Sequence, residues 1–331
     1  MVTAAPLGIV DTLSAGFAVV NRRLWILLLP VLLDLLLIYG PAISINPLVD
    51  EGVLLLQKSA QAQATGSDSG ASTSESTLLQ VLEQSQKSAA GFRDTNLAGV
   101  LAWQVPSVVA ATSATPLPKL RGPVITEVSS GWVLLSYVLA LALLSLLWVS
   151  FYLAALAHAL RNEVAAAASL VRRATSGWLS FSLFFALLLV LLIVTGGALV
   201  LVLGVASLFG SGVVALITSV VTALALAASF YLFFVDDAIF LLEVWPRRAV
   251  WYSVSVVWRN FWPSLGFVLL VNLVITGTAL VWGYLLQNPF GLAGAVLGHA
   301  YITTGFAAAG MLFFAQRYAL WQREAVPGGP G

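Results

Sequence analysis

The sequence predicts an all-α membrane protein in which six transmembrane helices form three pseudo-repeats, with one large extracytoplasmic loop. Three observations predict this fold class: 60% of the 331 residues are hydrophobic against 9% charged, six apolar runs approach or exceed the length of a bilayer crossing, and a basic amphipathic segment precedes every second run. A transmembrane helix needs about 20 largely apolar residues. Each pseudo-repeat is therefore expected to be an interfacial amphipathic helix followed by a helical hairpin.

The composition excludes several classes of protein. A soluble domain carries about 25% charged residues, so a chain with a mean hydropathy of +0.97 must use lipid as the solvent for much of its surface. The net charge of +1 argues against nucleic-acid binding, and the absence of cysteine removes disulfides, thiolate metal sites and thiol catalysis. Because the sequence also contains no Walker, GxSxG or HExxH motif, we expect a non-enzymatic protein without a cofactor.

The six crossings and the parts of the chain follow from the apolar runs. The crossings are predicted near residues 24–40, 132–158, 178–206, 212–236, 263–286 and 292–316. Tight turns at 207–212 and 287–291 force antiparallel hairpins. The predicted parts are 1–40 (interfacial helix and first span), 41–131 (extracytoplasmic helical loop), 132–160 (second span), 161–240 (second repeat), 241–320 (third repeat) and 321–331 (disordered cytoplasmic tail).

Two of the basic segments match under a fixed shift. The stretch 20–25 (VNRRLW) reads against 257–262 (VWRNFW), which lies 237 residues further along the chain. A shift that keeps apolar, basic and aromatic positions predicts an internal duplication.

Arginines in the short loops predict the orientation. They precede the first span, lie between the second and third and between the fourth and fifth, and follow the sixth, whereas the two tight turns contain no Lys or Arg. By the positive-inside rule both termini are cytoplasmic. The loop 41–131 is then extracytoplasmic.

That loop is expected to be a small helical cap with a flexible Ser/Ala/Gln/Gly stretch at 59–76. Helical patterns flank this stretch at 48–56 and 78–86, residues 96–103 read as a short helix, and prolines between 116 and 123 indicate an irregular return to the membrane. An alternative is that the loop docks other membrane subunits.

The basic segments predict helices that lie in the membrane surface, with the lipid bilayer as their partner. Their apolar faces, expected to sink into lipid, are Leu13, Phe17 and Val20 in the first copy and Val250, Val254 and Val257 in the third. The second copy, around 161–173, is weaker. The arginines expected to reach lipid headgroups are Arg22, Arg23, Arg172, Arg173, Arg248 and Arg259. Anchoring, lipid sensing and partner docking are all open functions of this face.

Polar groups inside the membrane are the main candidates for chemistry. Asp34 lies past the middle of the first span, and a carboxylate at that depth costs about 2.5–3.5 kcal/mol, so it should face protein or water. Its nearest counterpart in the fifth span is Asn272, after a slip of one residue in the repeat. We expect both side chains to point inward and to hold helices together by hydrogen bonds. A proton or cation relay is the alternative.

A second polar group is predicted at the cytoplasmic boundary. A shift of 80 carries 232–237 onto 312–317, and one of 79 aligns the second span with the fourth, so His158, Asp237 and Arg317 occupy equivalent positions. With Asp236 and Gln316 they predict a cluster in which Asp237 pairs with Arg317 and His158 adjoins. Cation binding is the alternative, although neighbouring residues on a helix do not face one site.

The two histidines are weighed as ligands of a tetrapyrrole. His158 and His299 are separated by most of the predicted membrane, so they cannot ligate one haem together. Either alone has the chemistry to ligate a chlorophyll-like magnesium, but a hydrogen-bonded histidine is the expectation.

Two stretches resemble known families. Residues 21–34 (NRRLWILLLPVLLD) look like the opening of uncharacterised multi-pass proteins of Chloroflexus-type bacteria. The stretch from Asp237 to Trp262 resembles the polytopic membrane domains that accompany some bacterial glycerophosphodiesterases. The resemblance implies a location in the bacterial inner membrane, and it carries over no catalytic residue.

Three functions fit this sequence. The first is a non-enzymatic scaffold or accessory subunit of a larger bacterial membrane assembly, which suits the scarcity of polar groups. The second is a small-solute or ion transporter or channel, which repeats and glycines would suit. The third is a lipid-binding or lipid-sensing protein that uses the surface helices.

Overall fold

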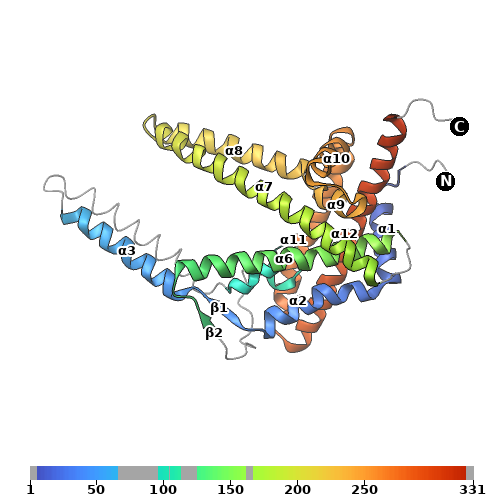
Figure 1. Cartoon of the computed structure of the whole chain (residues 1–331), viewed down its shortest axis with the longest axis horizontal. Helices are drawn as coiled ribbons and strands as arrows, with labels where there is room; N and C mark the ends of the chain where they lie inside the picture. Colours follow the sequence, from blue (N-terminus) through green and yellow to red (C-terminus); the bar gives the residue numbers. More distant parts are fainter. Residues whose placement is uncertain (1–5, 66–95, 104, 113–124, 162–166, 326–331) are drawn as a thin grey trace. The chain divides into compact units, whose positions relative to one another are not determined.

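The computed structural model describes residues 6–65, 96–103, 105–112, 125–161 and 167–325. The described chain is almost entirely helical, with one small sheet (Figure 1). It divides into two compact units, of which unit 1 comprises Met1–Val31 and Leu146–Gly331 and unit 2 comprises Leu32–Ser145. The all-α class predicted from the sequence is confirmed.

Most helices belong to unit 1. They are α1 (Ile9–Arg22), the 3-10 helix η1 (Leu24–Leu27), α7 (Ala167–Ser207), α8 (Ser211–Tyr231), α9 (Val235–Leu242), α10 (Pro246–Arg259), α11 (Phe261–Leu285) and α12 (Pro289–Ala325). Unit 2 contains β1 (Ala42–Ser44), α3 (Asn46–Thr65), the 3-10 helix η2 (Leu97–Ala102), α5 (Val108–Ala111) and β2 (Ile125–Glu127). The helices α2 (Leu28–Tyr39) and α6 (Gly131–Leu160) contribute residues to both units.

Among the described residues, five helices are long and apolar enough to cross a membrane: α6, α7, α8 continued into α9, α11 and α12. They coincide with the second to sixth predicted spans. The first predicted span, 24–40, contains only the 12 residues of α2 after η1. At 1.5 Å per residue α2 extends about 18 Å, less than the hydrocarbon core of about 30 Å, so length alone does not make it a crossing.

The second predicted interfacial helix is not a separate element. From Ala167 onward its residues are the first turns of α7, a continuous helix of 41 residues that is about 60 Å long. The other two copies have an interruption after the basic segment, at Arg23 and at Asn260, whereas no residue between Ala167 and Trp178 stops the helix. Residues 162–166 of this segment lie outside the described residues.

The helices α7 and α8 form an antiparallel hairpin (Figure 1), as predicted from the glycine turn. Gly210 in the turn has φ of 104°, a left-handed conformation that glycine adopts without the steric cost of a side chain.

Contrary to expectation, the apolar face of α1 packs against protein. The backbone N–H of Leu7 donates to Gln316 Oε1 (3.3 Å) and the hydroxyl of Tyr301 donates to Asn21 Oδ1 (2.9 Å), so α1 runs antiparallel along α12. Between these ends Gly16 lies so close that a Cβ there would be 2.6 Å from the backbone N of Ala309. A glycine at the crossing lets two helix backbones approach closely.

The helices α1 and α10 have matching bounds and burial. Adding 237 to Ile9–Arg22 gives Pro246–Arg259, the bounds of α10. The same addition carries the buried residues Thr12, Gly16 and Val20 onto Ala249, Ser253 and Val257, which are also buried. The face of α10 that packs against protein differs from the apolar face predicted from the sequence. Of the three valines of that predicted face, Val257 is buried, whereas Val250 and Val254 are only half-buried.

The inward face of α10 also holds the break between α8 and α9. The hydroxyl of Ser253 donates to the carbonyl of Tyr231 (2.7 Å) and accepts from the backbone N–H of Phe234 (3.2 Å). Phe234 then stacks on Phe313 of α12, at 5.4 Å between ring centroids, and Phe313 stacks on Phe267 of α11 at 4.8 Å. These rings form the core of unit 1.

Unit 2 contains a feature that the sequence did not predict. The strands β1 and β2 pair in parallel, with Ala42 opposite Ile125 and Ser44 opposite Glu127. Asn96 fastens the predicted short helix to them, because its Oδ1 accepts from the N–H of Ile43 (2.9 Å) and caps η2 through the N–H of Ala98 (3.0 Å). The entry and exit of the inserted loop are thus joined.

Two predictions of irregular structure are wrong where the structure describes them. Residues 59–65 of the predicted flexible stretch are helical in α3, since Ala and Gln are good helix formers. Residues 321–325 of the predicted tail continue α12. The helical pattern at 78–86, the prolines at 116–123 and the rest of both segments lie outside the described residues.

Candidate functional site

The strongest candidate site is the outer surface of the α7–α8 hairpin. The most apolar stretch of each helix, over 18 residues, has no buried residue, whereas 67% of the corresponding stretch of α12 is buried. Large side chains are widely exposed, among them Leu201 (74%), Leu208 (82%) and Phe209 (74%). Such a surface is not stable in water and must meet lipid or another apolar helix.

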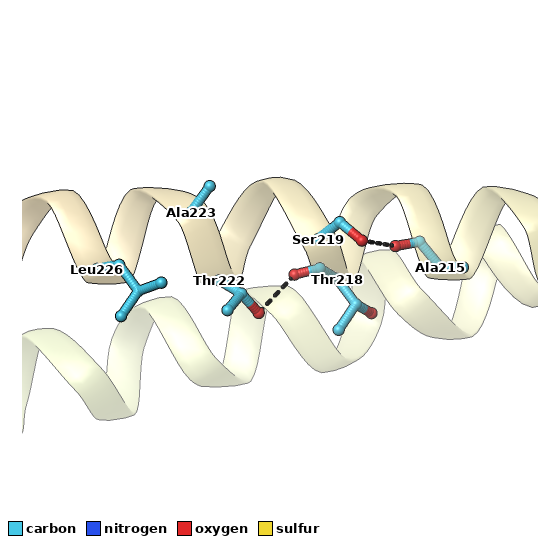
Figure 2. A pocket seen from close by; sticks show the side chains of 6 residues that line it. All are labelled: Ala215, Thr218, Ser219, Thr222, Ala223 and Leu226. Atoms are coloured by element: carbon cyan, nitrogen blue, oxygen red, sulfur yellow. Dashed lines mark hydrogen bonds between the residues drawn. The ribbon is translucent and has the colours of Figure 1, made fainter. Parts of the chain in front are cut away.

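A shallow hollow of about 600 Å³ lies along α8 in this hairpin. Its lining consists of small and hydroxyl side chains with one leucine: Ala215, Thr218, Ser219, Thr222, Ala223 and Leu226 (Figure 2). Ala215, Ser219 and Ala223 follow one another at intervals of four residues, so they lie on one face of the helix. We call these six residues the α8 strip.

The hydroxyls of the α8 strip bond to their own helix. Ser219 donates to the carbonyl of Ala215 (2.8 Å) and Thr222 to that of Thr218 (2.8 Å), as Figure 2 shows. Thr218 donates in the same way to Val214 (2.9 Å). Because their donors are already satisfied, these side chains can be covered by an apolar surface at little desolvation cost.

The hairpin is held at its base by a glycine contact and by the ion pair between Arg173 of α7 and Glu243. A Cβ on Gly177 of α7 would lie 2.3 Å from the ring of Phe240 in α9. Beside it, Glu243 Oε1 lies 3.2 Å from Arg161 Nη1 and 3.1 Å from Arg173 Nε. Arg161 also donates to the carbonyl of Leu241.

Glu243 was not singled out from the sequence. It ends α9 with φ of 52°, a left-handed conformation uncommon for a residue with a side chain. The signal was available, since Glu243 is an acidic residue between two strongly basic segments. At these partly exposed positions the ion pairs contribute at most about 1 kcal/mol each.

Asp34 is fully buried, as expected, but its partners are in the inserted loop. Its carboxylate accepts from Ser107 Oγ (2.5 Å) and from the backbone N–H groups of Val108 (3.1 Å) and, weakly, Val109 (3.5 Å). Ser107 in turn caps α5 through the N–H of Ala110 (3.2 Å). Asp34 therefore fastens α5 to α2.

The expectation that Asn272 points inward is wrong. The residue is exposed, and its amide donates to the carbonyl of Val268 one turn earlier in α11 (2.9 Å). The one-residue slip in the repeat explains the difference, because one residue rotates a side chain by about 100° around the helix.

The predicted boundary cluster is buried but is not paired as expected. His158, Asp237 and Arg317 are 1%, 6% and 5% exposed. Arg317 forms no ion pair with Asp237; its guanidinium lies 3.4 Å from the centroid of the Phe313 ring. Asp237 Oδ2 instead lies 3.6 Å from the position of a Cβ on Gly310, and seven residues of helix separate Gly310 from Arg317 by about 10 Å.

Gln316 and Asp236, the other two residues of the predicted boundary cluster, have different surroundings. Gln316 accepts from the N–H of Leu7, which precedes α1, and Asp236 is half-buried at the start of α9. His299 is buried in α12 and its carbonyl accepts from the hydroxyl of Thr303 (2.6 Å). Within the described ranges, no three His, Asp or Glu side chains gather closely enough to hold a metal ion.

The predicted headgroup arginines divide into two groups. Arg22, Arg172, Arg248 and Arg259 are exposed, whereas Arg23 and Arg173 are half-buried. Arg173 is the one whose ion pair with Glu243 anchors α7.

These features define a helical, multi-pass, membrane-embedded protein. Comparison of the chain with family models, with curated proteins and with solved structures gives no match.

Proposed function

We propose that the protein is a non-enzymatic membrane scaffold or accessory subunit of a larger assembly, and that the α7–α8 hairpin docks apolar transmembrane helices of a partner. The observation that carries this proposal is that the apolar stretches of both helices contain no buried residue. Among the described residues, contacts at Gly177 and Arg173 hold the base of the hairpin to the rest of unit 1, and two long apolar surfaces are left for other molecules.

The α8 strip supports a protein partner over lipid alone. Apolar surfaces gain little by leaving lipid for protein, so membrane helices associate through close packing at small residues and through polar contacts. The strip offers small residues at helical spacing, with hydroxyls alongside. Gly196, Gly197 and Gly204 add open helix surface on α7, where a Cβ would meet nothing within 4 Å.

The finer architecture is part of the proposal. We take the chain to cross a bacterial inner membrane six times, as three repeats, with both termini in the cytoplasm and the 41–131 insertion outside. The equal lengths and matching buried positions of α1 and α10 support the duplication.

Affinity purification from the native membrane tests the docking. The variant Ala223→Leu fills the α8 strip, and Ala228→Leu makes the same change at another exposed alanine on the opposite face of α8. We expect a membrane protein that copurifies with the wild type to be lost from Ala223→Leu and retained by Ala228→Leu. Equal retention by both variants, or the absence of any stoichiometric partner, would contradict the proposal.

A further inference from the structure

The outward face of α10 combines tryptophan and arginine. Trp251 and Trp258 are 63% and 73% exposed, and their separation of seven residues places them on one face of the helix. Arg247 and Arg248 are exposed at the start of the same helix. The helix contains three arginines and no acidic residue.

The position of α10 in the chain places this face at the membrane boundary. Only Asn260 separates the end of α10 from α11, which is long and apolar enough to cross a membrane. Trp262, in the first turn of α11, is 76% exposed. Tryptophan side chains are enriched at the level of the lipid headgroups, where one part of the ring is in an apolar and another in a polar environment.

We propose that this face of α10 binds the headgroups of anionic phospholipids, with the indoles at the acyl boundary and the arginines on the phosphates. Charge complementarity selects this occupant, because the helix carries only positive side chains. Glu243, the nearest acidic residue before α10, has its carboxylate on Arg161 and Arg173. The proposal does not depend on the docking of a partner by α8.

The matching helix α1 lacks the combination of tryptophan and arginine found on the outward face of α10. The shift of 237 that aligns the buried residues of the two helices carries Arg248, Trp251 and Trp258 onto Asp11, Ser14 and Asn21. Those three residues are exposed too, but they are polar and include an acid. The two helices therefore share an inward face and differ in the outward one, and lipid binding belongs to α10.

The lipid-facing residues also differ from those expected on amphipathicity alone. Val257 is fully buried in protein, and Tyr252 packs on Tyr318 of α12 with 5.1 Å between ring centroids. The valines were expected to meet lipid, but the most exposed apolar groups are the two tryptophans, on the side of the helix opposite the buried Ala249 and Ser253.

Native mass spectrometry of the purified full chain in neutral detergent tests the proposal. Phosphatidylglycerol or phosphatidylcholine is added and the retained lipid is counted. We expect Arg248→Gln to weaken phosphatidylglycerol retention about fivefold at low salt, since one cation near an anionic leaflet contributes about 1 kcal/mol and about 1.4 kcal/mol corresponds to tenfold. Phosphatidylcholine retention should not change.

The control is Arg323→Gln, which removes an exposed arginine from the end of α12. It should leave retention unchanged, whereas Trp251→Ser with Trp258→Asn should weaken retention of both lipids. Equal losses in Arg248→Gln and Arg323→Gln would overturn the proposal. So would displacement of the lipid by equimolar soluble glycerol phosphate, which would indicate a phosphate site without a membrane component.

Discussion

At the scale of single residues, buried and half-buried polar side chains hold segments of this protein together. Asp34, Ser253 and Asn96 each join two segments through hydrogen bonds to backbone N–H or C=O groups. The backbone groups that they bond to lie where a helix starts or breaks or in a strand, and those at helix ends lack helical partners. Their side chains supply the missing donors and acceptors.

Replacing Asp34 tests this role. In Asp34→Ala the hydroxyl of Ser107 and the N–H of Val108 lose a buried charged acceptor, so we expect the free energy of unfolding to fall by about 2–3 kcal/mol. Chemical unfolding in detergent measures the change, and proteolysis within 96–112 should become faster. Asn272→Ala is the control, because that exposed amide bonds only within its own helix and should change stability by less than about 0.5 kcal/mol. Equal effects would refute the assignment.

The identity of Asp34 as a special residue was predictable from the sequence, but its partner was not. A carboxylate in an apolar run must be satisfied by something, and the repeat suggested Asn272. The actual donors, from Ser107 to Val109, lie in an insertion that has no counterpart in the other copies. A comparison between repeated segments cannot predict contacts made by a segment that is not repeated.

At the scale of elements, the amphipathic pattern predicted which residues of α1 share a face but not what covers it. An apolar stripe opposite charged residues has the same appearance whether lipid or a helix lies beneath it. Gly16 was the distinguishing signal, since a glycine within the stripe allows a second helix to approach. In α10 the wide exposure of tryptophan, which sequence alone does not reveal, identifies the side that we propose to face lipid.

Two glycine substitutions, expected to change the free energy of unfolding in opposite directions, test the packing of α1. Gly16→Ala would place a Cβ 2.6–2.8 Å from backbone atoms of Gly305 and Ala309, which cannot move aside cheaply, so we expect a loss of about 1–3 kcal/mol. Gly204→Ala on α7 meets nothing within 4 Å and should stabilise the helix by up to about 1 kcal/mol. Unfolding curves of both variants decide the matter. Stabilisation by Gly16→Ala would mean that α1 does not lie against α12.

At the scale of the whole molecule, the five helices long and apolar enough to cross a membrane were predictable, because a continuous run of 18 or more apolar residues is typical of a transmembrane helix. The paired strands β1 and β2 were not, because three-residue strands carry no periodic pattern. The number of crossings depends on the stretch Leu24–Tyr39, whose length leaves it ambiguous.

A contact between the segment before α1 and the last helix, α12, limits the number of crossings. The N–H of Leu7, before α1, donates to Gln316 near the end of α12, so we expect the start of α1 and the end of α12 to lie on one side of the membrane. An odd number of crossings would place them on opposite sides. With five long spans, the stretch Leu24–Tyr39 is therefore expected to complete a sixth crossing.

Because the chain contains no cysteine, single cysteines report their side of the membrane without background. We expect Ser14→Cys and Gln322→Cys, both at exposed positions, to react with a membrane-impermeant maleimide only after the cells are permeabilised. Phe209→Cys and Gln287→Cys, in the turns without basic residues, should react in intact cells. Labelling of Ser14→Cys but not Gln322→Cys in intact cells would mean that Leu24–Tyr39 does not cross, and that α1 and the end of α12 are separated by the bilayer.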